Sequence, residues 1–305
     1  MWNDGSSRLK AKCFWAFVLM KILLTGADGF TGLSFTKAAQ AEGHEVIPLL
    51  ADLREPFKLK AELLACQPEA LVHLAAISFV GHENEAELYN VNVIGTVNLL
   101  NALMALPQRP QKVLLASSAN VYGNSPNSPI DELELLSPAN HYAVSKVAME
   151  LMAANFRHEF PIVVTRPFNY TGPGQAINFL IPKLVHHFKA KLPVIELGNL
   201  NVEREFNDVR MVCEAYLALL KLPSERGHLE VFNICSGQTY ALQDVIQLLT
   251  EITGHFLEVK VNPAFVRRHE VHQLCGNSAK LSHAIGPLRT YALRDTLQTM
   301  LEASE

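Results

Sequence analysis

An α/β fold with a doubly wound parallel sheet, together with a smaller mixed α/β portion, is the architecture that the sequence predicts. Three observations carry this prediction. Short apolar runs alternate with longer segments of helical periodicity, the first apolar run leads into a glycine-rich turn, and prolines interrupt the pattern after about residue 167. Such alternation is typical of βαβ units, whose parallel strands carry helices on both faces.

In chain order, the apolar or β-branched runs predict strands over residues 21–25, 44–50, 70–74, 112–116, 162–166 and 231–234. The periodic segments predict helices over residues 31–42, 90–106, 142–159 and 208–220, and later helices over 242–253 and 291–303. In a sheet of this kind the ligand lies outside the carboxyl ends of the strands. Residues that follow a predicted strand are therefore the first candidates for a site.

The stretch LLTGADGFTG places Gly26, Gly29 and Gly32 between the first predicted strand and the first predicted helix. Glycine lets another group approach the backbone closely, and a helix N-terminus offers free N–H groups and the positive end of its dipole to an anion. The stretch therefore predicts a pyrophosphate site. A glycine-rich turn alone is a weak signal, which the flanking strand and helix strengthen.

The composition limits the classes of partner. The 305 residues carry a net charge of −4, with 26 basic and 30 acidic residues in no block of either sign, so no nucleic acid and no membrane surface is expected as a partner. Five scattered cysteines form no C-x-x-C pair, and the twelve histidines lack partners at metal-ligand spacing. The sequence predicts reduced thiols, no metal, a cytoplasmic location and a small-molecule partner.

The chain is expected to divide into three parts. Residues 1–19 are expected to be a poorly ordered leader, because the basic and apolar stretch RLKAKCFWAFVL runs into the glycine motif without a signal-peptide cleavage site, with Met20 as the natural start. Residues 20–167, with returning segments from about residues 205–240, are expected to form a dinucleotide-binding domain. Residues 168–305 are expected to form mainly a substrate-binding portion.

The stretch YAVSK places Tyr142 and Lys146 four residues apart on a predicted helix, so both side chains leave the same face. A nearby ammonium favours the phenolate and is expected to lower the tyrosine pKa from about 10 by roughly 1 to 3 units. Ser117 and Ser118 follow the strand over 112–116, at the same edge as the glycine turn. Ser118, Tyr142 and Lys146 are predicted to transfer a proton to a carbonyl oxygen. A solvated surface pair is the alternative for Tyr142 and Lys146.

Six motifs follow one another along the chain: Thr25-Gly26-x-x-Gly29-x-x-Gly32, Asp52-Leu53, His73-Leu74-Ala75-Ala76, Asn92-x-x-Gly95-Thr96, Ser117-Ser118-x-x-Val121-Tyr122-Gly123 and Tyr142-x-x-x-Lys146. In these motifs the sequence, over about residues 20–300, resembles the extended short-chain dehydrogenase/reductase family, whose fold is of the Rossmann type. The stretches TRPFNYTGPGQ, GNLNVEREFNDV, FNICSG and VRRHEV resemble its branch of GDP-6-deoxy-D-mannose reductases and other nucleoside-diphosphate 4-keto-6-deoxyhexose 4-reductases.

The resemblance implies a role for each matching residue. The implied cofactor residues are Gly26, Gly29 and Gly32 at the pyrophosphate, Asp52 and Leu53 at the adenine, Leu74, Ala75 and Ala76 at the ribose, and also Phe30, Asn92, Tyr142, Lys146 and Pro167. Lys146 would also bind the nicotinamide ribose, whereas Asn92 could instead satisfy only backbone groups. The implied substrate residues are Ser78, Asn169, Gln175, Arg204, Arg267 and Glu270. A surface salt bridge is the alternative for each of the two arginines.

Two local features bear on the chemistry. Ala119 and Asn120 stand where the dehydratases of this superfamily carry acids, so an acid and a base for eliminating water are not evident. The segment HEVIPLLADLREP leaves the cofactor open between NADPH and NADH, since Arg54 could meet a 2′-phosphate or face solvent.

The resemblance therefore implies NAD(P)H-dependent reduction of the 4-keto group of a GDP- or dTDP-4-keto-6-deoxyhexose, which would make deoxysugars for a bacterial surface polysaccharide such as O-antigen. Two alternatives stay open: a 4-epimerase that keeps NAD tightly bound, and a catalytically silent dinucleotide-binding sensor. The resemblance also implies a homodimer through the helices over residues 90–106 and 142–159.

Overall fold

The computed structural model describes residues 19–79, 84–200, 202–265 and 273–303. Its main sheet has six parallel strands in the order β10-β5-β4-β3-β1-β2. Their bounds are Lys21–Thr25 (β1), Glu45–Pro48 (β2), Ala70–His73 (β3), Lys112–Ala116 (β4), Ile162–Pro167 (β5) and Leu229–Ile234 (β10). Because the chain runs from β1 to β2 and then returns to β3 on the other side of β1, the strand order reverses there. A ligand of such a sheet lies at this reversal, outside the carboxyl ends of β1 and β3.

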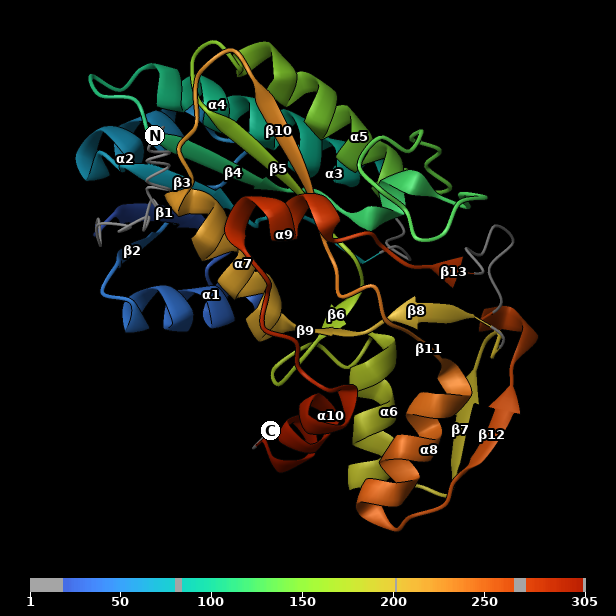
Figure 1. Cartoon of the computed structure of the whole chain (residues 1–305). Helices are drawn as coiled ribbons and strands as arrows, with labels where there is room; N and C mark the ends of the chain where they lie inside the picture. The colour runs from blue at the N-terminus through green and yellow to red at the C-terminus, as the bar shows by residue number, and fades with distance from the viewer. Residues whose placement is uncertain (1–18, 80–83, 201, 266–272, 304–305) are drawn as a thin grey trace, which may run out of the picture.

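Helices cover both faces of the main sheet (Figure 1). One layer holds α1 (Phe30–Ala41), α7 (Val209–Lys221) and α9 (Ala279–Ile285), and the other holds α2 (Pro56–Cys66), α3 (Glu85–Tyr89), α4 (Thr96–Met104) and α5 (His141–Ala153). Successive residues of β1 serve the two layers: Ile22 and Leu24 join the apolar cluster of α1 and α7, whereas Leu23 joins that of α2 and α4. The run is continuously apolar because this strand is buried on both faces.

The smaller portion lies below the main sheet in Figure 1. There α6 (Leu180–Lys189), α8 (Leu242–Thr253) and α10 (Leu293–Glu302) enclose an apolar cluster with the parallel pair β7 (Val194–Leu197) and β12 (Glu258–Val261). Short strands form the connection: β6 (Tyr170–Thr171) pairs with β9 (Asn207–Asp208), and β8 (Glu203–Glu205) pairs with β11 (Thr239–Ala241) and β13 (Gln273–Leu274).

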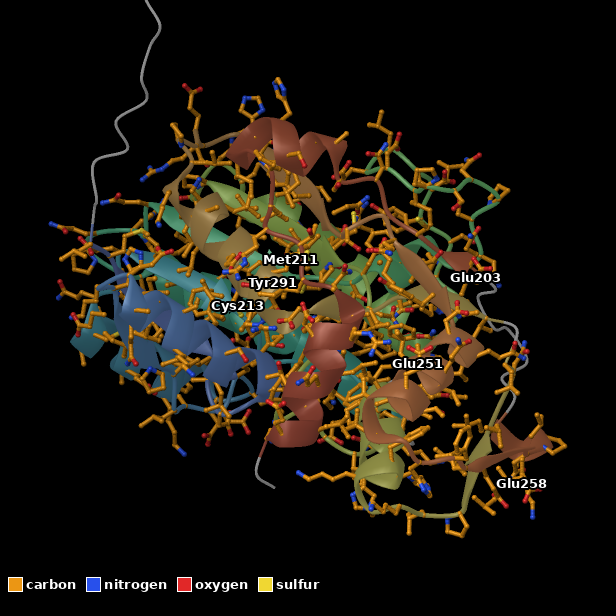
Figure 2. The ribbon with its side chains drawn as sticks, turned by 60° about the horizontal axis from the view of Figure 1, so that its bottom comes forward. Glu203, Met211, Cys213, Glu251, Glu258 and Tyr291 are labelled. Carbon is orange, nitrogen blue, oxygen red and sulfur yellow. The ribbon has the colours of Figure 1, made fainter. Side chains whose placement is uncertain are left out.

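The segment between α9 and α10 also joins the sheet to the smaller portion. Its Tyr291 donates a hydrogen bond to Glu214 of α7 at 2.6 Å, and the Arg210 guanidinium lies 4.2 Å from the centre of the tyrosine ring. Figure 2 shows Tyr291 beside Met211 and Cys213, which also belong to α7. A side chain that follows α9 and precedes α10 is thus anchored on α7, which itself covers the sheet.

The predicted α/β class and the parallel sheet are confirmed. The helix α2 was missed, although Pro56 at its start is a helix N-terminal signal. The helix predicted over 90–106 divides into a π-helix, η1 (Asn90–Gly95), and α4, and that predicted over 142–159 ends earlier, at Ala153. The predicted leader, apart from Leu19, lies outside the described residues. Within the described residues, no helix is long and apolar enough to cross a membrane.

Candidate active site

The three positions after β1 hold glycine for different structural reasons. Gly26 has a φ of +65°, and a Cβ atom there would lie 2.9 Å from the Ala75 nitrogen. A Cβ atom at Gly32 would lie 2.0 Å from the Gly26 carbonyl oxygen. At Gly29, where φ is −77°, a Cβ atom would meet only that same oxygen among the described residues, at 3.3 Å. The chain's own packing therefore explains Gly26 and Gly32, whereas Gly29 leaves the N-terminus of α1 open to an anion.

His73 fastens three elements together at the strand reversal. Its Nε2 bonds the Thr96 hydroxyl at 2.9 Å, and that hydroxyl donates to the Asn92 carbonyl at 2.7 Å, so Nε2 carries the proton. Its Nδ1 accepts from the Thr25 hydroxyl at 2.7 Å, and the Thr25 oxygen accepts from the nitrogens of residues 74 and 75. Burial lowers the pKa of His73 to about 3, so the ring is neutral. This chain of bonds sets residues 74 and 75 beside the glycine turn.

Asn92 lies in the π-helix η1 and is buried. Its Oδ1 accepts from the Ile77 nitrogen at 2.9 Å, and its Nδ2 donates to the Ile77 carbonyl at 3.1 Å and to the Ser145 hydroxyl at 3.0 Å. These bonds match the alternative in which Asn92 satisfies backbone groups. They also fix the loop whose next residue, Ser78, is exposed.

Ser118, Tyr142 and Lys146 come together between β4 and α5, and all are nearly buried, with exposures of 7%, 7% and 4%. Ser118 follows β4 and caps a short 3-10 helix, η2 (Ala119–Tyr122). Asn140 caps α5 by accepting from Ala143, which fixes the start of the helix just before Tyr142. Ser118 interacts with the Tyr142 hydroxyl and acts to lower its pKa. The predicted proton-transfer set is therefore assembled in space, and the surface-pair alternative does not hold.

The expected direction of the Tyr142 pKa is wrong. Burial raises it to about 12, although the interaction with Ser118 acts in the opposite direction. Burial likewise lowers the pKa of Lys146 to about 8. The Lys146 ammonium donates to the Ala116 carbonyl at 2.8 Å, and loss of solvation outweighs any help that it gives to a phenolate. Tyr142 is thus a protonated phenol at neutral pH.

At the predicted adenine site, Asp52 and Arg54 form an exposed ion pair. Arg54 donates to the Asp52 carboxylate from Nε at 2.9 Å and from a terminal nitrogen at 2.6 Å. Hydrogen bonds from Arg54 lower the pKa of Asp52 to about 2. Leu53 is buried, and a Cβ atom at Gly95 would lie 2.8 Å from its Cβ atom. Asp52 therefore lies at the surface with its carboxylate bound to Arg54, while Leu53 packs against the π-helix.

Two further residues of the predicted cofactor set lie at the same edge of the sheet. Phe30 begins α1, and its ring stacks on Tyr170 with centres 6.0 Å apart and planes 16° apart. The Tyr170 hydroxyl bonds the Thr31 hydroxyl at 2.8 Å. Pro167 ends β5, where it pairs in register with Ile234. Phe30 thus helps to attach β6 to the glycine turn.

Of the predicted substrate residues, Asn169, Gln175 and Arg204 lie in or beside the smaller portion. Asn169 is exposed, and its carbonyl accepts from the Asn207 nitrogen at 2.9 Å. Gln175 bonds Thr171 at 2.7 Å within its own turn and lines a hollow of about 370 Å³ between α6 and α10. Arg204 is half-buried in β8. Arg267 and Glu270 lie outside the described residues.

Glu205 is a buried acid that the sequence reasoning missed. Its carboxylate is fully buried and accepts from the Gly276 nitrogen at 2.6 Å, the Ser236 nitrogen at 2.8 Å and the Asn207 amide at 2.9 Å. It thereby ties β8 to the loops after β10 and β13, beside Arg204. In the sequence it reads as one more charged residue, and only its burial reveals the role.

Within the described residues, no group of acids, histidines and cysteines could hold a metal ion.

The fold and this site place the chain in a known family. Residues 31–300 match the model of the GDP-mannose 4,6 dehydratase family, and the chain belongs to that family, within the extended short-chain dehydrogenases/reductases. It is 37% identical to GDP-6-deoxy-D-talose 4-dehydrogenase of Aggregatibacter actinomycetemcomitans, over 92% of this chain and 97% of the relative. It is 34% identical to GDP-6-deoxy-D-mannose reductase of Pseudomonas aeruginosa, over 92% and 96%.

A solved structure agrees with this placement. RMD from Pseudomonas aeruginosa, complexed with NADPH, has a TM-score of 0.83 and 32% identity over 92% of this chain and 97% of that one. The recognised family and the Rossmann-type fold are thus confirmed. The family consists of NAD(P)-dependent oxidoreductases that act on nucleotide sugars, so the expected class of cofactor, NADPH or NADH, is confirmed as well.

Proposed function

We propose that this chain reduces the 4-keto group of a nucleoside-diphosphate 4-keto-6-deoxyhexose, with GDP or dTDP as the nucleotide. The observation that carries the proposal is the assembly of Ser118, Tyr142 and Lys146 at the carboxyl edge of the sheet, beside the glycine turn. Its two relatives named above act on GDP-6-deoxyhexoses, as their names state. Deoxysugar synthesis for a surface polysaccharide, in the cytoplasm, is part of the same proposal.

In the proposed reaction, the cofactor supplies the hydride, and residues of this chain hold the substrate and supply the proton. A bound reduced nicotinamide supplies the hydride that C4 of the sugar accepts. The hydroxyls of Ser118 and Tyr142 hold the carbonyl oxygen, and Tyr142 gives its proton to that oxygen as C4 becomes an alcohol. A phenol that stays protonated near neutral pH can serve as the acid in this step.

The chain offers a fitting cradle for the cofactor. The absence of a Cβ atom at Gly29 leaves the start of α1 accessible, and the helix dipole favours a pyrophosphate there. Asp52 would bind the adenine, residues 74–76 would line the ribose, and Lys146 would bind the nicotinamide ribose. Phe30, Leu53, Asn92 and Pro167 complete the proposed set of cofactor residues.

For the nucleotide sugar, Ser78, Asn169, Gln175 and Arg204 are the proposed ligands among the described residues. Arg204 offers the planar fork of donors that suits a diphosphate. Arg267 and Glu270 are proposed from the sequence alone. Ala119 and Asn120 provide no carboxyl group next to Ser118, so elimination of water is not part of the proposed reaction.

We also propose a homodimer. Apolar side chains are exposed on the outer side of η1 and α5, among them Ile94 at 51%, Leu151 at 65% and Met152 at 40%. Burial of such a surface against a second copy would remove it from water. Light scattering on the eluted protein tests this, and a monomer at micromolar concentration would reject it.

The test of the reaction is the loss of absorbance of the reduced nicotinamide. NADPH and NADH are offered in turn with GDP-4-keto-6-deoxymannose or dTDP-4-keto-6-deoxyglucose. Oxidation with one combination would support the proposal and identify both nucleotides. Folded protein that oxidises neither cofactor, yet retains NAD through purification, would instead be a 4-epimerase. A silent sensor would bind the cofactor, turn over none of these substrates and lose nothing in Tyr142→Phe.

A further inference from the structure

The end of β4 is held from α5 by two charged side chains one helical turn apart. Lys146 donates to the carbonyl of Ala116, and Glu150 accepts a hydrogen bond of 2.5 Å from the hydroxyl of Ser117. The next residue along the chain is Ser118. The helix α5, which carries Tyr142 and Lys146, is thus hydrogen-bonded to Ala116 and Ser117, the two residues that precede Ser118.

Glu150 is itself held in a buried ion pair with Arg166 of β5. Arg166 donates to its carboxylate from Nε at 3.0 Å and from a terminal nitrogen at 2.6 Å, and both side chains are 6% exposed. The guanidinium also donates to the Tyr122 hydroxyl at 2.9 Å and lies 5.0 Å from the centre of that ring. The Glu150 carboxylate thus accepts hydrogen bonds from both Ser117 and Arg166, and Arg166 is itself bonded to Tyr122. These bonds hold the carboxylate in one position.

We propose that Glu150 is a positioning residue for proton transfer: it aligns Ser118 through Ser117, and its negative charge lies one helical turn from Lys146, which holds the neighbouring residue Ala116. The proposal rests on the proposed reduction. A buried ion pair often adds no net stability to a protein, so stability alone does not explain the pair Glu150–Arg166. The proposed positioning role does explain it.

The groups around Lys146 support this assignment. On its own helix, Tyr142 is a neutral phenol and Glu150 is the negative charge that raises the pKa of Lys146 against the effect of burial. From β3, His73 faces it as a neutral ring. From β5, Arg166 is paired with Glu150. Glu150 is therefore the carboxylate that sustains the ammonium.

The test compares variants across pH. In Glu150→Gln the positive Arg166 remains without its partner, so the pKa of Lys146 should fall by about 1 unit or more. With the wild-type pKa at about 8, the variant's rate relative to wild type should fall from near equality at acidic pH to about a tenth at alkaline pH. Ser117→Ala removes only the hydroxyl and should lower the rate by the same factor at every pH. Glu159→Gln, which breaks a surface pair with Arg109, is the control and should change neither.

A second readout does not depend on turnover. In protein labelled with ¹³C at the lysine ε-carbons, the Lys146 signal, identified by its loss in Lys146→Met, reports its pKa directly. A lower value in Glu150→Gln supports the proposal, and an unchanged value overturns it. If wild type has no reductase activity, the proposed function fails while this titration still decides the role of Glu150.

If Glu150→Gln fails to fold, both members of the ion pair can be replaced together. The double variant Glu150→Gln/Arg166→Met leaves no unpaired buried charge, a change that proteins often tolerate. Its Lys146 pKa should lie below that of wild type. A value equal to wild type would overturn the proposal, because it would mean that the Glu150 charge does not act on Lys146.

Discussion

A matched pair of alanine substitutions separates the two reasons for glycine in the turn after β1. In Gly32→Ala the new Cβ atom would lie 2.0 Å from the Gly26 carbonyl oxygen, far inside an ordinary contact of about 3.5 Å. The gain of about 1 kcal/mol from alanine in a helix is then outweighed, because overpacking costs about 1–3 kcal/mol and the displaced group is backbone. We expect a lower Tm and weaker cofactor binding together.

Gly29→Ala should behave in the opposite way. Its φ of −77° suits alanine, and its nearest described atom lies at 3.3 Å, so only a few tenths of an ångström of adjustment are needed. Alanine also reduces the freedom of the unfolded chain, worth about 0.4–1 kcal/mol. We expect a Tm equal to or slightly above that of wild type, but a cofactor Kd raised about tenfold, or ~1.4 kcal/mol, because the methyl group enters the space of the pyrophosphate.

Thermal unfolding and titration of NADPH or NADH fluorescence on each purified variant measure the two quantities. The reasoning is refuted if Gly32→Ala is as stable as wild type, or if Gly29→Ala binds the cofactor unchanged. The second result would mean that no ligand approaches the backbone at Gly29, and that the open start of α1 is not the pyrophosphate site.

Three further predictions concern the site. Tyr142→Phe should lower kcat by about 10²–10⁴-fold, and full turnover in stopped-flow assays would show that another group gives the proton. The folded-state pKa is about 8 for Lys146 and about 12 for Tyr142. The rate of reduction should therefore fall as pH rises through about 8, where Lys146 loses its proton while the Tyr142 phenol keeps its own. A rate that stays flat well above about pH 8 contradicts this. Glu205→Ala leaves the donors of Gly276, Ser236 and Asn207 without their acceptor. At about 1–3 kcal/mol for each unpaired group, the free energy of unfolding measured in urea should fall by ~3 kcal/mol or more, and a smaller loss would show that water replaces the carboxylate.

Local spacing in the sequence determined the parts of this protein that depend on neighbouring residues. The apolar run before three glycines specifies a strand, a turn and a helix N-terminus, because backbone freedom and helix dipoles act over a few residues. The spacing of Tyr142 and Lys146 likewise sets them on one helical face. Alternation of such units was enough to predict the parallel sheet and the edge at which the site lies.

Only the tertiary structure decided the properties that depend on burial. Tyr142 and Lys146 are neighbours as predicted, but the protein around them removes water, so the tyrosine pKa rises where a solvated pair would show a fall. Glu150 and Glu205 look like surface acids in the sequence. Each is buried against partners that lie far along the chain, and desolvation together with those distant contacts is a property of the folded packing that local spacing does not carry.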